Sequence, residues 1–143
     1  MILPDLNVLL YAFRTDVPEH PKHKIWLEKV ITDEQTFGIS PQALASVLRI
    51  ATQRRLFAQP SSLTEALSFA SALLDHPNCQ IVEPGPRHWD IFTNLCRISD
   101  AKGNLVQDAW FAALAIEQGC EWITLDKDFG RFSGLRWRSP DAA

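Results

Sequence analysis

The chain has 143 residues, of which 46% are hydrophobic and 22% charged, and these values are typical of one folded domain rather than a disordered or fibrous chain. Fourteen Lys and Arg against seventeen Asp and Glu give a net charge of −3, which excludes a surface that is basic throughout. The apolar runs are far shorter than a membrane span and no secretory leader is visible, so we expect a single domain over residues 1–143, in the cytoplasm and without a membrane partner.

Strand-like and helix-like segments alternate along the chain. Ser40 precedes a proline and is expected to cap a helix, and Ser62 with Glu65 forms a capping box. Asn104 is expected to cap the last long helix with Gln107 as its reciprocal partner. The expected strands are residues 1–5, 36–40, 79–83 and 122–125, and the expected helices are residues 6–13, 21–31, 41–53, 63–74, 89–98 and 105–118.

This alternation predicts the fold class, because parallel strands need helical connections that cover the sheet. We expect an α/β three-layer sandwich with a mostly parallel central sheet flanked by helices. No internal repeat or low-complexity tract divides the chain.

Three carboxylates occupy places where open α/β sheets carry their sites. Asp5 and Asp126 follow predicted strands, and Asp108 lies near the start of the last long helix. Each has an ordinary structural interpretation: Asp5 caps a helix, Asp108 complements a helix N-terminus, and Asp126 begins a turn. Asp108, however, shares its helical face with Phe111 and several alanines, where an unpaired carboxylate is costly to desolvate.

Carboxylates that gather in one place either share protons or bind a hard cation. Oxygen ligands that leave room for water suit Mg²⁺ or Mn²⁺. Such an ion activates water and neutralises the charge that develops on a phosphodiester. Since the chain carries no G-x-S-x-G, Walker A or zinc motif, hydrolysis at phosphorus is the chemistry that fits these residues best.

Two groups of basic residues are candidates for holding a nucleic-acid backbone, although a run of charges is most often a solvated face. The first lies at the end of the third helix and comprises Arg49, Arg54 and Arg55. The second lies near the C-terminus and comprises Lys127, Arg131, Arg136 and Arg138. We expect Arg49, Arg54, Arg55 and Arg131 to contact RNA.

The chain resembles the PIN-domain toxins called VapC, and the resemblance extends over essentially its whole length. It is carried by three segments, which read DLNVLLYA from Asp5, GNLVQDA from Gly103 and TLDKDF from Thr124. The trailing segment FSGLRW from Phe132 extends it. Each motif is moderately specific alone, and their order and spacing are strongly so.

The resemblance implies an endoribonuclease toxin of a type II toxin–antitoxin system that depends on Mg²⁺ or Mn²⁺, is neutralised by a VapB-type antitoxin and forms a homodimer. It implies that Asp5, Asp108 and Asp126 are the catalytic residues and metal ligands. Asp128 is expected in the same cluster. The supporting residues are expected to be Asn7, Ser46, Asn104 and Thr124.

One position departs from the family pattern. Many PIN domains have a Glu on the helix after the second strand, where this chain has Ser46. A hydroxyl offers neither full charge nor a bidentate grip, so we expect weaker cation binding, use of a single ion, or compensation by Asp128. The alternative function is a catalytically weak or inactive module that binds RNA or antitoxin.

Two further hypotheses remain open from the sequence. Asp5-x-Asn7 distantly resembles phosphatases with an aspartate nucleophile, although Asn7 lacks the acid that those enzymes use. Separately, the helix over residues 63–74 and the helix that carries Trp26 offer apolar faces to an amphipathic antitoxin segment, against ordinary core packing as the alternative.

Overall fold

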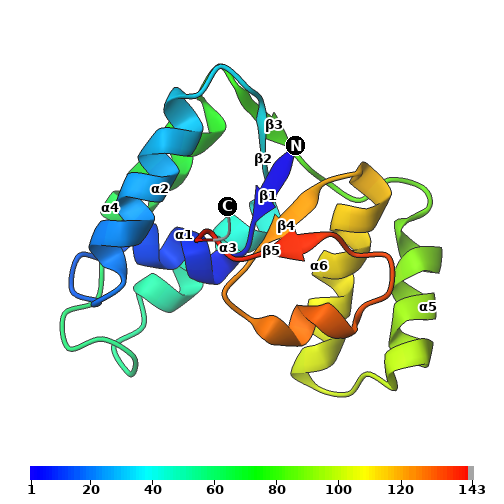
Figure 1. Ribbon diagram of the computed structural model, residues 1–143. Helices are drawn as coiled ribbons and strands as arrows, with labels where there is room; N and C mark the ends of the chain where they lie inside the picture. Colours follow the sequence, from blue (N-terminus) through cyan, green and yellow to red (C-terminus); the bar gives the residue numbers. More distant parts are fainter. Residues whose placement is uncertain (142–143) are drawn as a thin grey trace.

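The computed structural model describes residues 1–141 and confirms the α/β class with parallel strands and flanking helices (Figure 1). The strands are β1 (Ile2–Pro4), β2 (Phe37–Ile39), β3 (Cys79–Ile81), β4 (Glu121–Ile123) and β5 (Trp137–Arg138). The helices are α1 (Leu6–Phe13), α2 (His20–Thr32), α3 (Pro41–Ala51), α4 (Leu63–Leu74), α5 (His88–Ser99), α6 (Asn104–Gln118) and the 3-10 helix η1 (Lys127–Arg131).

The strands form two hydrogen-bonded groups with the orders β1-β4-β5 and β2-β3, and every pairing is parallel. β2 lies against β1, because a Cβ at Gly38 would come within 3.2 Å of the Ile2 carbonyl oxygen. In the β1–β4 register Pro4 faces Ile123, so the residues that follow these two strands emerge side by side. This edge of the sheet is where the predicted carboxylates gather.

Two hydrophobic clusters lie on the two sides of the strands. One joins α1, α2, α3 and α4 to β2 and has Leu9, Phe37 and Val47 among its buried members. The other joins α5 and α6 to β4 and contains Phe111 and Trp122, whose rings stack at 5.4 Å. Figure 1 shows α1, α2 and α4 on one side of the strands and α5 and α6 on the other, which gives the three layers.

The caps decide where several helices begin. The Ser40 hydroxyl accepts a hydrogen bond from the Ala43 amide at 3.3 Å, as expected for an N-cap. Ser62 accepts from the Glu65 amide at 3.1 Å, which confirms it as the N-cap. The Glu65 carboxylate accepts from the Ser62 hydroxyl at 3.0 Å and not from the Ser62 amide, so the reciprocal bond of a capping box is not formed.

The predicted cap of α6 is wrong. Gly103, with a φ of 60°, is the N-cap and makes no side-chain cap bond, whereas Asn104 is the first helical residue. A glycine adopts this left-handed φ without strain, so the helix begins one residue earlier than the capping pattern indicates. Gln107 consequently has no capping role and its side chain is exposed. Gly119 ends the helix with a φ of 68°, as expected.

Two short elements were not predicted. Three residues separate η1 from the end of β4, and β5 contains only two residues, which pair with Trp122 and Ile123. A two-residue strand shows no alternation of apolar and polar residues, so only its partner identifies it. Within residues 1–141 no helix has both the length and the apolar character needed to cross a bilayer.

Candidate active site

Asp5 lies at the junction between β1 and α1 and is only 5% exposed. Its Oδ1 accepts a hydrogen bond from the Leu6 amide at 2.6 Å, and its Oδ2 accepts from the Thr124 hydroxyl at 2.7 Å. The Asp5 amide donates to the Ile123 carbonyl at 2.8 Å and continues the strand pairing. The sheet register therefore joins two residues that are 119 positions apart in the chain.

Thr124 links Asp5 to the next two carboxylates. Its hydroxyl oxygen accepts a hydrogen bond from the Asp126 amide at 3.1 Å. The Asp126 Oδ1 in turn accepts from the Asp128 amide at 2.9 Å and caps η1. Asp126 can therefore begin a turn and also belong to the cluster, because its Oδ1 makes the cap and its Oδ2 has no hydrogen-bond partner among residues 1–141.

Burial, together with the neighbouring charges, raises the pKa of two carboxyl groups in the cluster. Burial is the main cause that raises the pKa of Asp5 to about 6; the bonds from Thr124 and Leu6 oppose this rise, and the charges of Asp108 and Asp126 add to it. Burial also raises the pKa of Asp108, with further contributions from Asp126 and Asp128. Asp108 is half-buried and comes from α6, so three separate segments supply the negative charge.

Arg131 is a basic residue that lies at this cluster. Its Nη2 lies 3.8 Å from the Asp128 carboxylate, and its charge lowers the pKa of Asp108. Both residues of the ion pair are substantially exposed, so the pair is weak and Arg131 is able to exchange partners.

The other predicted arginines lie elsewhere. Arg14, at the end of α1, stacks on Phe57 and donates to the Ser61 hydroxyl, so the loop after α3 packs at this end of α1. Asp5 lies at the other end of α1, which is eight residues and therefore roughly 12 Å long. Arg54 and Arg55 belong to that loop and Arg49 to the last turn of α3, so these three are not brought together with the carboxylates.

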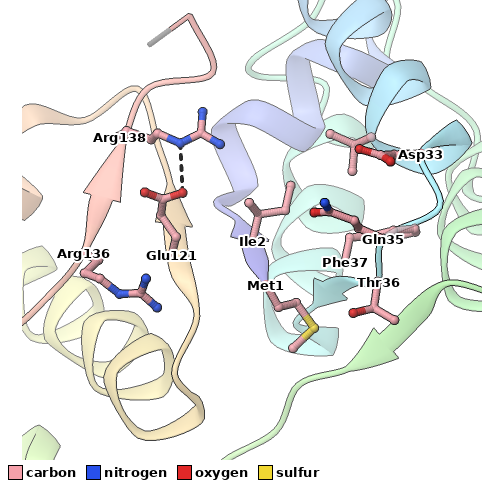
Figure 2. Close-up of a pocket in the computed structure, with 10 residues that line it drawn as sticks. Met1, Ile2, Asp33, Gln35, Thr36, Phe37, Glu121, Arg136 and Arg138 are labelled. Atoms are coloured by element: carbon pink, nitrogen blue, oxygen red, sulfur yellow. Dashed lines mark hydrogen bonds and ion pairs between the residues drawn. The ribbon is translucent and has the colours of Figure 1, made fainter. Parts of the chain in front are cut away.

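Arg136 and Arg138 line a different pocket, of about 350 Å³, which is formed largely by first residues of strands (Figure 2). Arg138 donates to the Glu121 carboxylate at 2.9 Å, and Arg136 donates to the Gly119 carbonyl at 3.0 Å. The basic residues near the C-terminus are thus divided. Arg131 lies beside the carboxylates at the carboxyl ends of the strands, whereas Arg136 and Arg138 line a pocket at the amino ends.

The predicted supporting residues occupy different environments. The Oδ1 atom of Asn7, in the first turn of α1, is buried and has no hydrogen-bond donor among residues 1–141. Ser46 is 8% exposed and its hydroxyl donates to the Gln42 carbonyl at 3.2 Å, so it serves its own helix. The side chain of Asn104 is exposed and makes no hydrogen bond within the described part of the chain.

The donor set fits a hydrated hard cation better than a closed metal cage. Among residues 1–141 no three Asp, Glu, His or Cys side chains are placed to hold one ion directly. Mg²⁺ usually keeps several waters and takes only one or two carboxylates from a protein. The raised pKa values of Asp5 and Asp108, together with the unpartnered oxygen of Asn7, are features that an added positive charge would relieve.

Sequence reasoning missed two features of this site. The bond from Thr124 to Asp5 depends on the β1–β4 register, which no local pattern in either segment reveals. The approach of Arg131 depends on η1, whose signal was limited to the spacing of Asp126, Asp128 and Gly130.

Comparison with known proteins identifies the family to which the chain belongs. The PIN domain model matches residues 2–135. Ribonuclease VapC43 of Mycobacterium tuberculosis is 40% identical over 140 residues, covering 98% of this chain and 95% of the relative. Ribonuclease VapC31 of the same species is 39% identical over 140 residues, covering 98% and 99%.

Solved structures agree on the fold. The structure of VapBC2 from Rickettsia felis bound to a promoter DNA fragment matches with a TM-score of 0.68 and 19% identity, over 97% of this chain and 98% of that one. VapC20 of Mycobacterium tuberculosis, described as a toxin that cleaves the sarcin–ricin loop, matches with a TM-score of 0.65 and 16% identity, over 95% and 99%. The chain therefore belongs to the PIN-domain family, among the relatives named VapC.

Proposed function

We propose that this protein is a metal-dependent endoribonuclease that acts as the toxin of a toxin–antitoxin pair. The observation that supports it most is the buried Asp5, whose pKa is raised to about 6 beside Asp108 and Asp126. A buried carboxylate with other carboxylates beside it costs stability when it is ionised, and such groups are common at functional sites. The relatives named ribonuclease VapC support RNA as the substrate.

We propose that Asp5, Asp108, Asp126 and Asp128 would hold a hydrated Mg²⁺ or Mn²⁺, in part through the water molecules of the ion. Such an ion, when bound, supplies a lowered pKa for coordinated water and neutralises charge on the phosphate. Thr124 fixes the orientation of Asp5 by donating to its Oδ2. The carboxamide oxygen of Asn7 adds an acceptor without adding charge.

Arg131 is proposed to position the RNA backbone. Its guanidinium already lies at the cluster, and its exposed ion pair with Asp128 is readily exchanged for a phosphate. Arg49, Arg54 and Arg55 would contact only RNA that extends along α1, away from the cleaved bond.

One observation favours the alternative of a weak or inactive binding module. The Ser46 hydroxyl is engaged by the Gln42 carbonyl, so it does not replace the charge of the Glu found in many PIN domains. A phosphatase with Asp5 as nucleophile is disfavoured, because both Asp5 oxygens accept hydrogen bonds and the side chain is 5% exposed.

For the antitoxin we propose a groove between α1, α2 and α4. It has a volume of about 230 Å³ and an apolar floor formed by side chains that include Leu27, Phe69 and Leu73, with Lys24 and Glu28 also in its lining. An apolar groove with charged residues suits an amphipathic helix. A homodimer is also proposed, on the family resemblance alone.

The deciding experiment measures cleavage of RNA by the purified chain in Mg²⁺, in Mn²⁺ and in EDTA. We expect Asp108→Asn to lower kcat/KM by about 100-fold or more. The matched control is Asp100→Asn, which changes an exposed carboxylate just before α6 and should leave cleavage intact. Cleavage that persists in EDTA and in both Asp5→Asn and Asp108→Asn would overturn the proposal, whereas RNA binding without turnover would select the binding module.

A further inference from the structure

A small pocket of about 160 Å³ lies between the helices α3, α5 and α6. Its lining consists of Gln42 from α3, Phe92 from α5, and Val106, Gln107 and Trp110 from α6. None of these side chains is charged, so the pocket is not suited to a phosphate, which needs a cation. Aromatic faces combined with free amides suit a planar molecule that has polar edges.

Two lining residues connect this pocket to the candidate site. Gln107 directly precedes Asp108 on α6. Gln42 lies one turn before Ser46 on α3, and its carbonyl accepts the Ser46 hydroxyl. The pocket therefore borders the turns of α6 and α3 that carry Asp108 and Ser46.

The aromatic wall is held in place before any ligand arrives. The Trp110 ring meets His88 edge-on at 4.8 Å and Phe111 at 5.2 Å. The buried His88 ring also stacks on Phe92 at 6.1 Å, and its Nε2 lies 2.9 Å from the Trp110 carbonyl oxygen. Trp110 remains half-exposed, so part of its ring is available for stacking.

The two amides are free to bind. Gln42 and Gln107 are exposed, and neither side chain is hydrogen-bonded within residues 1–141. By contrast, the Gln118 amide at the other end of α6 is used by the Glu117 carboxylate at 3.1 Å. A carboxamide offers a donor and an acceptor together, which is the combination that reads the edge of a nucleobase.

We infer that this pocket receives one unpaired base of the RNA next to the cleaved phosphate, with Trp110 as the stacking surface and Gln42 and Gln107 as the groups that select the base. The inference rests on the proposed function and deepens it from RNA cleavage to base selection. Proteins that read single-stranded RNA splay bases out, stack them on aromatic rings and bond their edges.

The first test is a cleavage assay on single-stranded RNAs in which each base flanking the cut is varied in turn. We expect Gln107→Ala or Gln42→Ala to reduce the preference for one base at one flanking position by about tenfold, with little effect on the poorest substrate. The matched control, Gln80→Ala, changes an exposed glutamine on β3 and should leave the preference unchanged. A preference that survives both pocket variants would refute the inference.

The second test does not depend on turnover. In EDTA, tetranucleotides of rA, rC, rG or rU are added to isotope-labelled protein, and the amide signals of Gln42 and Gln107 and the indole signal of Trp110 are followed by NMR. We expect these signals to shift most with one base and not with ribose 5-phosphate, and Trp110→Phe, which preserves a ring in the core, to weaken binding about tenfold.

These outcomes separate the two proposals. Base-dependent shifts without cleavage in Mg²⁺ or Mn²⁺ would support the base pocket and refute the nuclease. Cleavage accompanied by no shift at the three residues would refute the base pocket and leave the nuclease intact.

Discussion

Asp5→Asn is expected to stabilise the ion-free protein while abolishing cleavage. The pKa of Asp5 is about 6 in the folded chain and 3.8 in the reference state. At about 1.4 kcal/mol per pKa unit, ionised Asp5 therefore costs the folded state about 3 kcal/mol above pH 7. The asparagine cannot ionise, but it loses one of the bonds with Thr124 and Leu6, worth about 1 kcal/mol. A net gain of about 1–3 kcal/mol remains.

The sign of the pH dependence follows from proton binding. Between pH 4 and 6 the folded protein holds more protons at Asp5 than the unfolded chain does, so the free energy of unfolding falls as pH rises through this range. The advantage of Asp5→Asn should therefore be close to zero near pH 4 and complete by pH 7.

The assay is urea unfolding in EDTA at pH 4, 5, 6 and 8, with Asp100→Asn as the exposed control, which should change stability by less than about 0.5 kcal/mol. Addition of Mg²⁺ should raise the stability of the parent protein and not of Asp5→Asn, because an ion that binds only the folded state stabilises it. A variant that is less stable than the parent at pH 8, or a difference that does not depend on pH, would refute the reasoning.

Three further changes test neighbouring parts of the structure. Thr124→Val removes the hydroxyl that donates to Asp5, so the pKa of Asp5 should rise further. The acid side of the pH profile of kcat/KM should then move to higher pH, and the free energy of unfolding should fall by about 1–2 kcal/mol. An unchanged pH profile would contradict this expectation. Ser46→Glu adds a carboxylate and should tighten Mg²⁺ binding by about tenfold in calorimetry, whereas unchanged affinity would show that Ser46 does not face the ion. Arg14→Lys loses the planar stacking on Phe57 and should lower the free energy of unfolding, measured in urea, by about 1–2 kcal/mol. The affinity for Mg²⁺ should stay the same. A loss of Mg²⁺ affinity would show that the loop after α3 contributes to the carboxylate site.

The sequence predicted the elements whose signals are local. The apolar run after Asp5 predicted α1 with its observed bounds. Ser40 and Ser62 were predictable as N-caps because a cap bonds an amide only three residues away, so its signal lies within one turn of the chain. The predicted cap of α6 was wrong because the actual N-cap is a glycine with a positive φ. A glycine has no polar side chain, so the sequence carries no capping signal at that position.

The sequence by itself determined the alternation of strands and helices, and with it the α/β class, because hydrophobic period and caps act within a few residues of each other. It also marked Asp108 as unusual for its position on a mostly apolar helical face. Only the tertiary structure decided which charged groups meet: the β1–β4 register brings Thr124 to Asp5, and η1 brings Arg131 beside the carboxylates. The same chain path puts Arg54 and Arg55 in the loop after α3 and lets Arg136 line a pocket formed largely by first residues of strands. Charge interactions depend on distance in space, and that distance is fixed by packing between segments rather than by spacing within them.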